Sequence, residues 1–232
     1  MFFPFIVALF RQEVNPLTLN MNDILQDLKD SNPEIKRLAA KALAQHGDTS
    51  QNLIIDALES ADKDTATIMY NTLFDAPGDF TKVFNKGTQE RDPHIRCQAI
   101  RYLFRNGSFK PSEGVAWLSD HDPYVRRRVI SYLSWMNDRS NLSSIMHIAV
   151  KDEDPKVRKD ALKLASVWGR KNDAGNIIDA LKDKDAEVKI QAIFTLKKIT
   201  GEDFGNPSEA TDDELTWIVA KWQGWWKIIK DI

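Results

Sequence analysis

Apolar side chains recur along most of this chain at the three- and four-residue spacing that is typical of one face of an α-helix. Between residues 123 and 136 they stand at Val125, Val129, Ile130, Leu133 and Met136, which form one stripe. A shorter apolar run, VAWL at residues 115–118, precedes this segment. The pattern therefore predicts helices in pairs, a short helix A followed by a longer helix B.

The predicted B helices share one phrase that begins with Asp or Asn. The copies are NPEIKRLAAKAL from Asn32, DPHIRCQAIRYL from Asp92, DPYVRRRVISYL from Asp122, DPKVRKDALKLA from Asp154, DAEVKIQAIFTL from Asp185 and a worn copy, DTATIMYNTLF, from Asp64. The period is near 31 residues. One pair cannot bury its own stripe, so neighbouring pairs must stack. We expect an all-α fold, an α-α superhelix of about six two-helix repeats, with thirteen or fourteen helices between residues 21 and 232.

The ends of each predicted B helix carry suitable capping residues. An Asp or Asn side chain accepts hydrogen bonds from the first backbone N–H groups, and Pro at the first helical position loses no bond. Four glycines, Gly47, Gly107, Gly169 and Gly201, follow B helices. A helix often ends at a glycine in the left-handed conformation, and we expect that conformation at all four.

This repeat resembles the HEAT repeat, in particular the short bacterial PBS-lyase HEAT-like repeat. The resemblance covers residues 21–201 and rests on Asp-Pro-x-Val-Arg followed by Ala and Leu at helical spacing. It implies a HEAT-like, armadillo-like solenoid whose B helices line the concave surface. Two copies depart from the pattern. The worn copy from Asp64, which is the second in chain order, lacks both Pro and Arg. The sixth, from Asp185, has Ala186 and Lys189 in their places.

The two ends of the chain differ from the repeats. Residues 1–20 begin MFFPFIVALF, an apolar run about half as long as a membrane-spanning helix needs, so we expect no membrane span. This extension has three interpretations: a gene start placed too early, a piece that packs on the stack, or an anchor. Residues 202–232 contain Trp217, Trp222, Trp225 and Trp226. We expect them to form a cap on the last repeat, the alternative being an exposed aromatic binding site.

The composition suits a globular protein and offers little catalytic chemistry. Hydrophobic residues make up 42% and charged residues 28%. Cys97 is the single cysteine, which suits a reducing compartment and predicts a cytoplasmic protein. The four histidines show no paired metal spacing, and the sequence has no phosphate-binding loop and no GxSxG elbow. We therefore expect no metal, no cofactor and no enzymatic activity.

The basic residue that follows Val or Ile in each phrase has a structural interpretation. In the fourth copy, Arg126 lies about 100° from Val125 around the helix, at the edge of the buried arc. From there it can reach an aspartate in the turn of its own or the next repeat. We expect a ladder of Asp–Arg pairs between repeats.

The opposite arc of the B helices is basic and partly aromatic. The six predicted B helices carry a net charge of +12, although the whole chain carries −2. Such segregation predicts a binding surface, or else B helices that complement acidic A helices. The candidate residues are Arg37, Lys41, Arg101, Phe104, Arg105, Tyr124, Arg127, Arg128, Trp135, Lys159, Lys163, Phe194, Lys197 and Lys198.

These features favour a non-catalytic scaffold or adaptor that binds another protein, through an acidic segment or helix, in a basic concave groove. Trp135, Phe104 and Phe194 are the expected anchors. The alternative is nucleic-acid binding by the same groove, which requires a steep salt dependence. A bilin-lyase-like activity is a remote third hypothesis, suggested by the name of the repeat alone. The sequence defines neither the partner nor the oligomeric state.

Overall fold

A computed structural model describes residues 20–136 and 138–230, apart from the side chains of residues 48 and 49. Within these ranges the protein has thirteen α-helices and no β-strand. The predicted all-α class and helix number are confirmed. The predicted N-terminal extension, residues 1–20, lies outside the described residues except for residue 20. No helix of the described ranges is long and apolar enough to cross a membrane.

Twelve of the helices form six consecutive A–B pairs, and the two helices of each pair pack on each other. The A helices are α2 (Met21–Asp27), α4 (Gln51–Glu59), α6 (Thr81–Gly87), α8 (Pro111–Trp117), α10 (Leu142–Lys151) and α12 (Ala174–Ile178). The B helices are α3 (Pro33–Gln45), α5 (Lys63–Phe74), α7 (Pro93–Arg105), α9 (Pro123–Met136), α11 (Pro155–Trp168) and α13 (Ala186–Thr200). Short 3₁₀ turns occupy Gly47–Ser50, Arg139–Asn141, Lys171–Asp173 and Asp179–Lys182.

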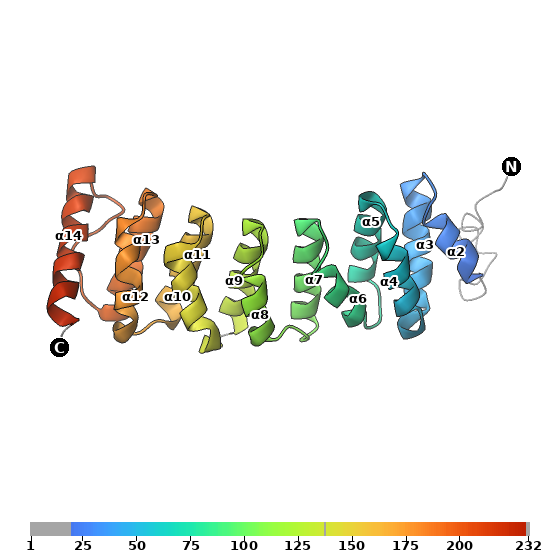
Figure 1. The fold of residues 1–232 in the computed structure, drawn as a ribbon, viewed down its shortest axis with the longest axis horizontal. Helices are drawn as coiled ribbons and strands as arrows, with labels where there is room; N and C mark the ends of the chain where they lie inside the picture. Colours follow the sequence, from blue (N-terminus) through green and yellow to red (C-terminus); the bar gives the residue numbers. More distant parts are fainter. Residues whose placement is uncertain (1–19, 137, 231–232) are drawn as a thin grey trace. The chain divides into compact units, whose positions relative to one another are not determined.

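The chain divides into two compact units between Phe109 and Lys110, and the predicted run of repeats at residues 21–201 extends over both. In the first unit α3, α5 and α7 follow one another side by side, as do α9, α11 and α13 in the second (Figure 1). Each unit thus contains three A–B pairs. The second unit also contains α14 (Asp212–Ile229).

The caps of the B helices correct the predicted start of the second repeat. The carboxylate of Asp62, rather than Asp64, caps α5 by accepting a hydrogen bond from the Thr65 N–H at 2.7 Å. The first four caps, Asn32, Asp62, Asp92 and Asp122, are therefore spaced by thirty residues each. Burial agrees with this register, because the third residue of every B helix is buried: Ile35, Thr65, Ile95, Val125, Val157 and Val188.

Three of the four helix-ending glycines have the predicted left-handed conformation. Gly47, Gly107 and Gly201 have φ of 59°, 70° and 81°. The prediction is wrong for Gly169, whose φ is −67° and ψ 159°. A Cβ there would lie 2.7 Å from the Ala165 carbonyl oxygen and 3.2 Å from Ile199. Gly169 is therefore required by close packing at the end of α11 and not by its φ angle.

Arginines at the fourth position of the B helices join successive repeats, as predicted. Arg126 donates from Nε and Nη2 to Asp152 of the next repeat at 2.8 and 2.7 Å, and from Nη1 to the Asp120 carbonyl at 2.7 Å. Arg158 bonds Asp183 in the same two-pronged way at 2.6 and 2.8 Å. Such paired bonds fix both the distance and the relative orientation of the guanidinium and the carboxylate. Each of these bridges between consecutive repeats is called a rung below.

The rung at Asp183 predicts a loss of stability in acid. Burial alone would raise the pKa of Asp183, but the hydrogen bonds from Arg158 and the Asp185 N–H lower it below its ordinary value of 3.8. A carboxylate with a lowered folded pKa stabilises the fold above its unfolded pKa and loses that contribution as pH falls through the folded pKa. Urea unfolding of wild type and Asp183→Asn should therefore differ at pH 7 and converge as the pH falls below the lowered pKa of folded Asp183. A difference that stays constant with pH would contradict this origin.

The helix α14 packs on the last repeat through its tryptophans. Trp222 is fully buried, and its ring meets Phe204 edge-on at 4.8 Å and Trp225 at 5.5 Å. The Trp226 ring lies against Gly175 of α12, where a Cβ would come within 2.6 Å of it. Trp217 points away and is 57% exposed. The inner tryptophans thus pack within α14 and against the last repeat, whereas Trp217 is exposed.

Candidate functional site

The candidate residues lie on the outward arc of the B helices, and each unit presents its own set. In the second unit they belong to α9, α11 and α13, whose outward arc is called the second-unit face below. Most are exposed, and Arg127, Lys159 and Lys197 are half-buried. The first-unit set belongs to α3 and α7, where Phe104 is half-buried and the others are exposed.

An exposed apolar row distinguishes the second-unit face. Trp135 is 69% exposed, although its ring meets Tyr132 edge-on at 5.7 Å. The equivalent position on the neighbouring helix α11 holds Val167, which is 61% exposed. On α13 the same position holds Lys198, and Phe194, one turn earlier, is 37% exposed. Val167 is not among the residues predicted from the sequence, although it lies 32 residues, one repeat, after Trp135 and this spacing could have revealed it.

Several cations of the second-unit face form ion pairs with nearby carboxylates. Arg127 donates to Asp160 of α11 at 2.7 Å, and Lys163 lies 3.7 Å from the same side chain. Lys159 pairs with Glu187 of α13, the next B helix. Lys197 lies 2.6 Å from Asp203. These four basic residues are thus paired with acids of the B helices or of the loop after α13.

Arg128 and Tyr124 of α9 contact each other on this face. Arg128 donates to the Tyr124 hydroxyl at 3.2 Å, and its guanidinium lies 5.2 Å from the centre of that ring. Both side chains are exposed. Lys198 is exposed near the end of α13. Since Arg128 stands seven residues before Trp135, the two lie on the same side of α9, two turns apart.

Three basic side chains of the first unit contact side chains of the same unit. Arg101 and Arg105 lie over the Phe74 ring at 5.1 and 4.2 Å, and Arg105 also lies 3.6 Å from Asp75. Arg37 pairs with Glu34 on its own helix. The Phe104 ring packs edge-on against Phe109 at 6.0 Å. This half-buried ring presents less surface than Trp135 to a partner.

A shallow pocket of about 430 Å³ lies between α3 and α5 on the B side of the first unit. The predicted residues Arg37 and Lys41 line it together with Ala44, Gln45, Asn71, Thr72, Asp75, Ala76 and Pro77. The position equivalent to Trp135 holds polar residues in this unit: Gln45, Asp75 and Arg105. The first unit therefore has no counterpart of the apolar row within its described residues.

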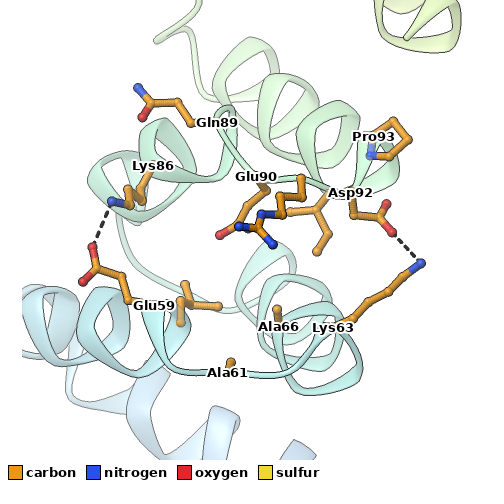
Figure 2. Close-up of a pocket in the computed structure, with 12 residues that line it drawn as sticks. Glu59, Ala61, Lys63, Ala66, Lys86, Gln89, Glu90, Asp92 and Pro93 are labelled. Atoms are coloured by element: carbon orange, nitrogen blue, oxygen red, sulfur yellow. Dashed lines mark hydrogen bonds and ion pairs between the residues drawn. The ribbon is translucent and has the colours of Figure 1, made fainter. Parts of the chain in front are cut away.

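Other chemistry is sparse in the part of the chain that the structure describes. No three His, Cys, Asp or Glu side chains of these residues gather as a metal site. Cys97 is buried in α7, so solvent has little access to its sulfur. A further pocket of about 860 Å³ lies at the turns of the first unit and carries mixed charges (Figure 2).

No family model matches this chain, and no curated protein matches it significantly. Among solved structures, the crystal structure of an engineered protein from the Northeast Structural Genomics Consortium is similar, with 19% identity and a TM-score of 0.40 over 79% of this chain and 98% of its own. A second engineered protein from the same consortium shows 17% identity and a TM-score of 0.41 over 94% of this chain and 64% of its own. These likenesses are too remote to support an argument about function.

Proposed function

We propose that this protein is a non-catalytic binding module whose second-unit face takes an acidic amphipathic helix of a partner protein. The observation that carries the proposal is the exposed apolar row of Trp135 and Val167 on neighbouring helices. Large exposed aromatic side chains cost free energy in water and are frequent centres of protein interfaces. A surface that only faces solvent has no need of this row.

The charge around the row favours an acidic partner. Within the three B helices of the second unit, Lys and Arg outnumber Asp and Glu. The ion pairs with Asp160 and Glu187 neutralise part of this excess, while Arg128 and Lys198 add positive charge beside the row. Complementary charge steers a partner toward a surface and fixes its register.

The spacing of the row favours a helix as the bound element. Axes of packed helices lie about 8–10 Å apart, which is therefore the step from Trp135 to Val167 across α9 and α11. A helix rises about 10.5 Å over seven residues, which repeats one face after nearly two turns. A partner helix that crosses the B helices can thus place two apolar residues, seven apart, on Trp135 and Val167. The acidic residues of the partner helix would flank these two apolar residues.

Replacing Trp135 by alanine tests the proposal. Because the side chain is 69% exposed, the melting temperature should change little. Loss of an interface anchor should weaken partner binding by about 30-fold, the equivalent of a 2 kcal/mol hot spot. Once the partner has been isolated by affinity capture on the wild-type protein, calorimetric titration would measure its dissociation constant for each variant. The matched control is Trp217→Ala, an exposed tryptophan of the same unit outside the second-unit face, and equal binding by both variants would contradict the proposal.

The salt dependence separates a protein partner from nucleic acid. For a partner helix, Arg128→Glu with Lys198→Glu should weaken binding and reduce its salt dependence, while Trp135→Ala should leave that dependence nearly unchanged. Arg127 and Lys159 are left unchanged in this variant because their ion pairs join neighbouring helices. Nuclease-sensitive capture with a steep salt slope would instead favour the nucleic-acid hypothesis.

A further inference from the structure

The rungs between repeats follow a rule with two positions. The donor is the fourth residue of a B helix, and the acceptor is the side chain two residues before the next cap. The donor positions hold Lys36, Ala66, Arg96, Arg126, Arg158 and Lys189, and the acceptor positions hold Asp30, Ser60, Glu90, Asp120, Asp152 and Asp183. The rungs from Arg126 and Arg158 show what a complete one contains: two parallel hydrogen bonds to a carboxylate and a third to a carbonyl of the donor's own turn.

The rung between the second and third repeats has an acceptor without a donor. Its donor position is Ala66, which is 6% exposed and too short to reach across. Its acceptor is Glu90, which accepts a hydrogen bond from the Tyr70 hydroxyl at 3.3 Å. Among the described residues no Lys or Arg forms an ion pair with Glu90. The acceptor carboxylate of this rung is thus present, but the guanidinium that Arg126 and Arg158 supply in their rungs is missing.

A cavity of about 860 Å³ opens at this place, and Ala66 and Glu90 both line it. Figure 2 shows Glu90 and Ala66 between two ion pairs that bridge the repeats. Lys86 lies 2.9 Å from Glu59 on one side, and Lys63 lies 2.8 Å from Asp92 on the other. These two lysines are already paired, and Glu90 is the lining carboxylate for which the described residues show no ion pair. The volume is in the range that holds small ligands or a side chain of a partner.

We propose that this cavity binds the guanidinium group of an arginine side chain supplied by a partner molecule. The group would take the place of the missing rung, with two parallel N–H bonds to the Glu90 carboxylate and a third to the turn that contains Ser60. A guanidinium suits the site better than an ammonium group because its planar donors match a carboxylate in pairs. Arg91 also lines the cavity and sets a repulsive charge beside it, which limits the affinity for a single guanidinium. The inference concerns the first unit and does not depend on the second-unit face.

Titration of the full chain with N-acetyl-arginine amide tests this site. We expect chemical-shift changes of the Ala66 and Glu90 backbone amides that saturate in the millimolar range, as for a single charged contact. N-acetyl-citrulline amide has the same shape without the charge and should cause no shifts. N-acetyl-lysine amide should bind at least several-fold more weakly. Equal shifts from citrulline and arginine, or arginine shifts spread over other surfaces, would overturn the proposal.

Two variants of the site distinguish it from nonspecific attraction. Glu90→Gln removes the acceptor and should abolish the shifts, whereas Glu59→Gln changes another acid of the same cavity and should retain them. Ala66→Arg supplies the missing donor from within the chain. It should raise the melting temperature by a few degrees and prevent binding of the arginine amide. If Glu90→Gln or Ala66→Arg binds the amide like wild type, the missing rung is not the site.

Discussion

Replacing Arg158 by alanine should lower the free energy of unfolding by about 3–5 kcal/mol, because it leaves a buried carboxylate without its cation. The side chains of Arg158 and Asp183 are 5% and 7% exposed, so water cannot replace the lost bonds. The carbonyls of Asp152 and Glu153 also lose their donor. Chemical denaturation of the full chain, followed by amide hydrogen exchange in the second unit, would measure the loss.

Two comparisons identify the cause of that loss. Lys159→Ala removes the adjacent cation, whose partner Glu187 is 72% exposed, and should cost less than about 1 kcal/mol. Combining Arg158→Met with Asp183→Asn removes both charges and keeps the oxygen that accepts from the Asp185 N–H at 2.9 Å. This double variant should recover much of the stability. A double variant no more stable than Arg158→Met alone would show that the unpaired charge is not the cause of the loss.

The second large effect is expected at Trp222. Truncation of this fully buried side chain to alanine should cost about 3–5 kcal/mol, because it removes the ring that Phe204 and Trp225 pack against. The indole N–H has no hydrogen-bond partner among the described residues, so the ring contributes through packing. Trp222→Phe should therefore be much milder than Trp222→Ala. Unfolding followed by tryptophan fluorescence and circular dichroism would test both variants.

Trp217 provides the matched control on the same helix. It is 57% exposed, with the Lys221 ammonium 5.0 Å from its ring centre. Trp217→Ala should change the free energy of unfolding by less than about 1 kcal/mol. If both alanine variants are equally stable, α14 is not a cap on the last repeat, and an aromatic binding role for this segment gains support.

The repeat pattern was enough to predict the helices, their pairing and the rungs, because each depends on residues within one period. The start of the second repeat was misplaced by two residues. Without Pro or Arg, Asp62 and Asp64 are equally good caps by sequence, and only the burial of Thr65 and Met69 decides between them. Gly169 was misassigned because its constraint is a neighbour, Ile199, from the following helix.

The candidate surface was predicted less completely than the fold. Counting charges along single helices found the basic B helices but could not show which carboxylates neutralise them. The pair of Arg127 with Asp160 spans 33 residues, roughly one repeat, so it depends on how two helices pack. The division after Phe109 was also not foreseen, since the repeat phrase continues across it without interruption.

Site-specific photo-crosslinking in cells tests the central claim most directly. A benzophenone amino acid would be placed at position 135, at 167 or at the exposed Ser143 of α10, in separate variants. The account predicts that positions 135 and 167 capture the same protein, through an acidic helical segment whose crosslinked residues lie about seven apart, and that position 143 does not. Capture of that protein equally from position 143, or nuclease-sensitive adducts at position 135, would contradict a helix-binding site on the second-unit face.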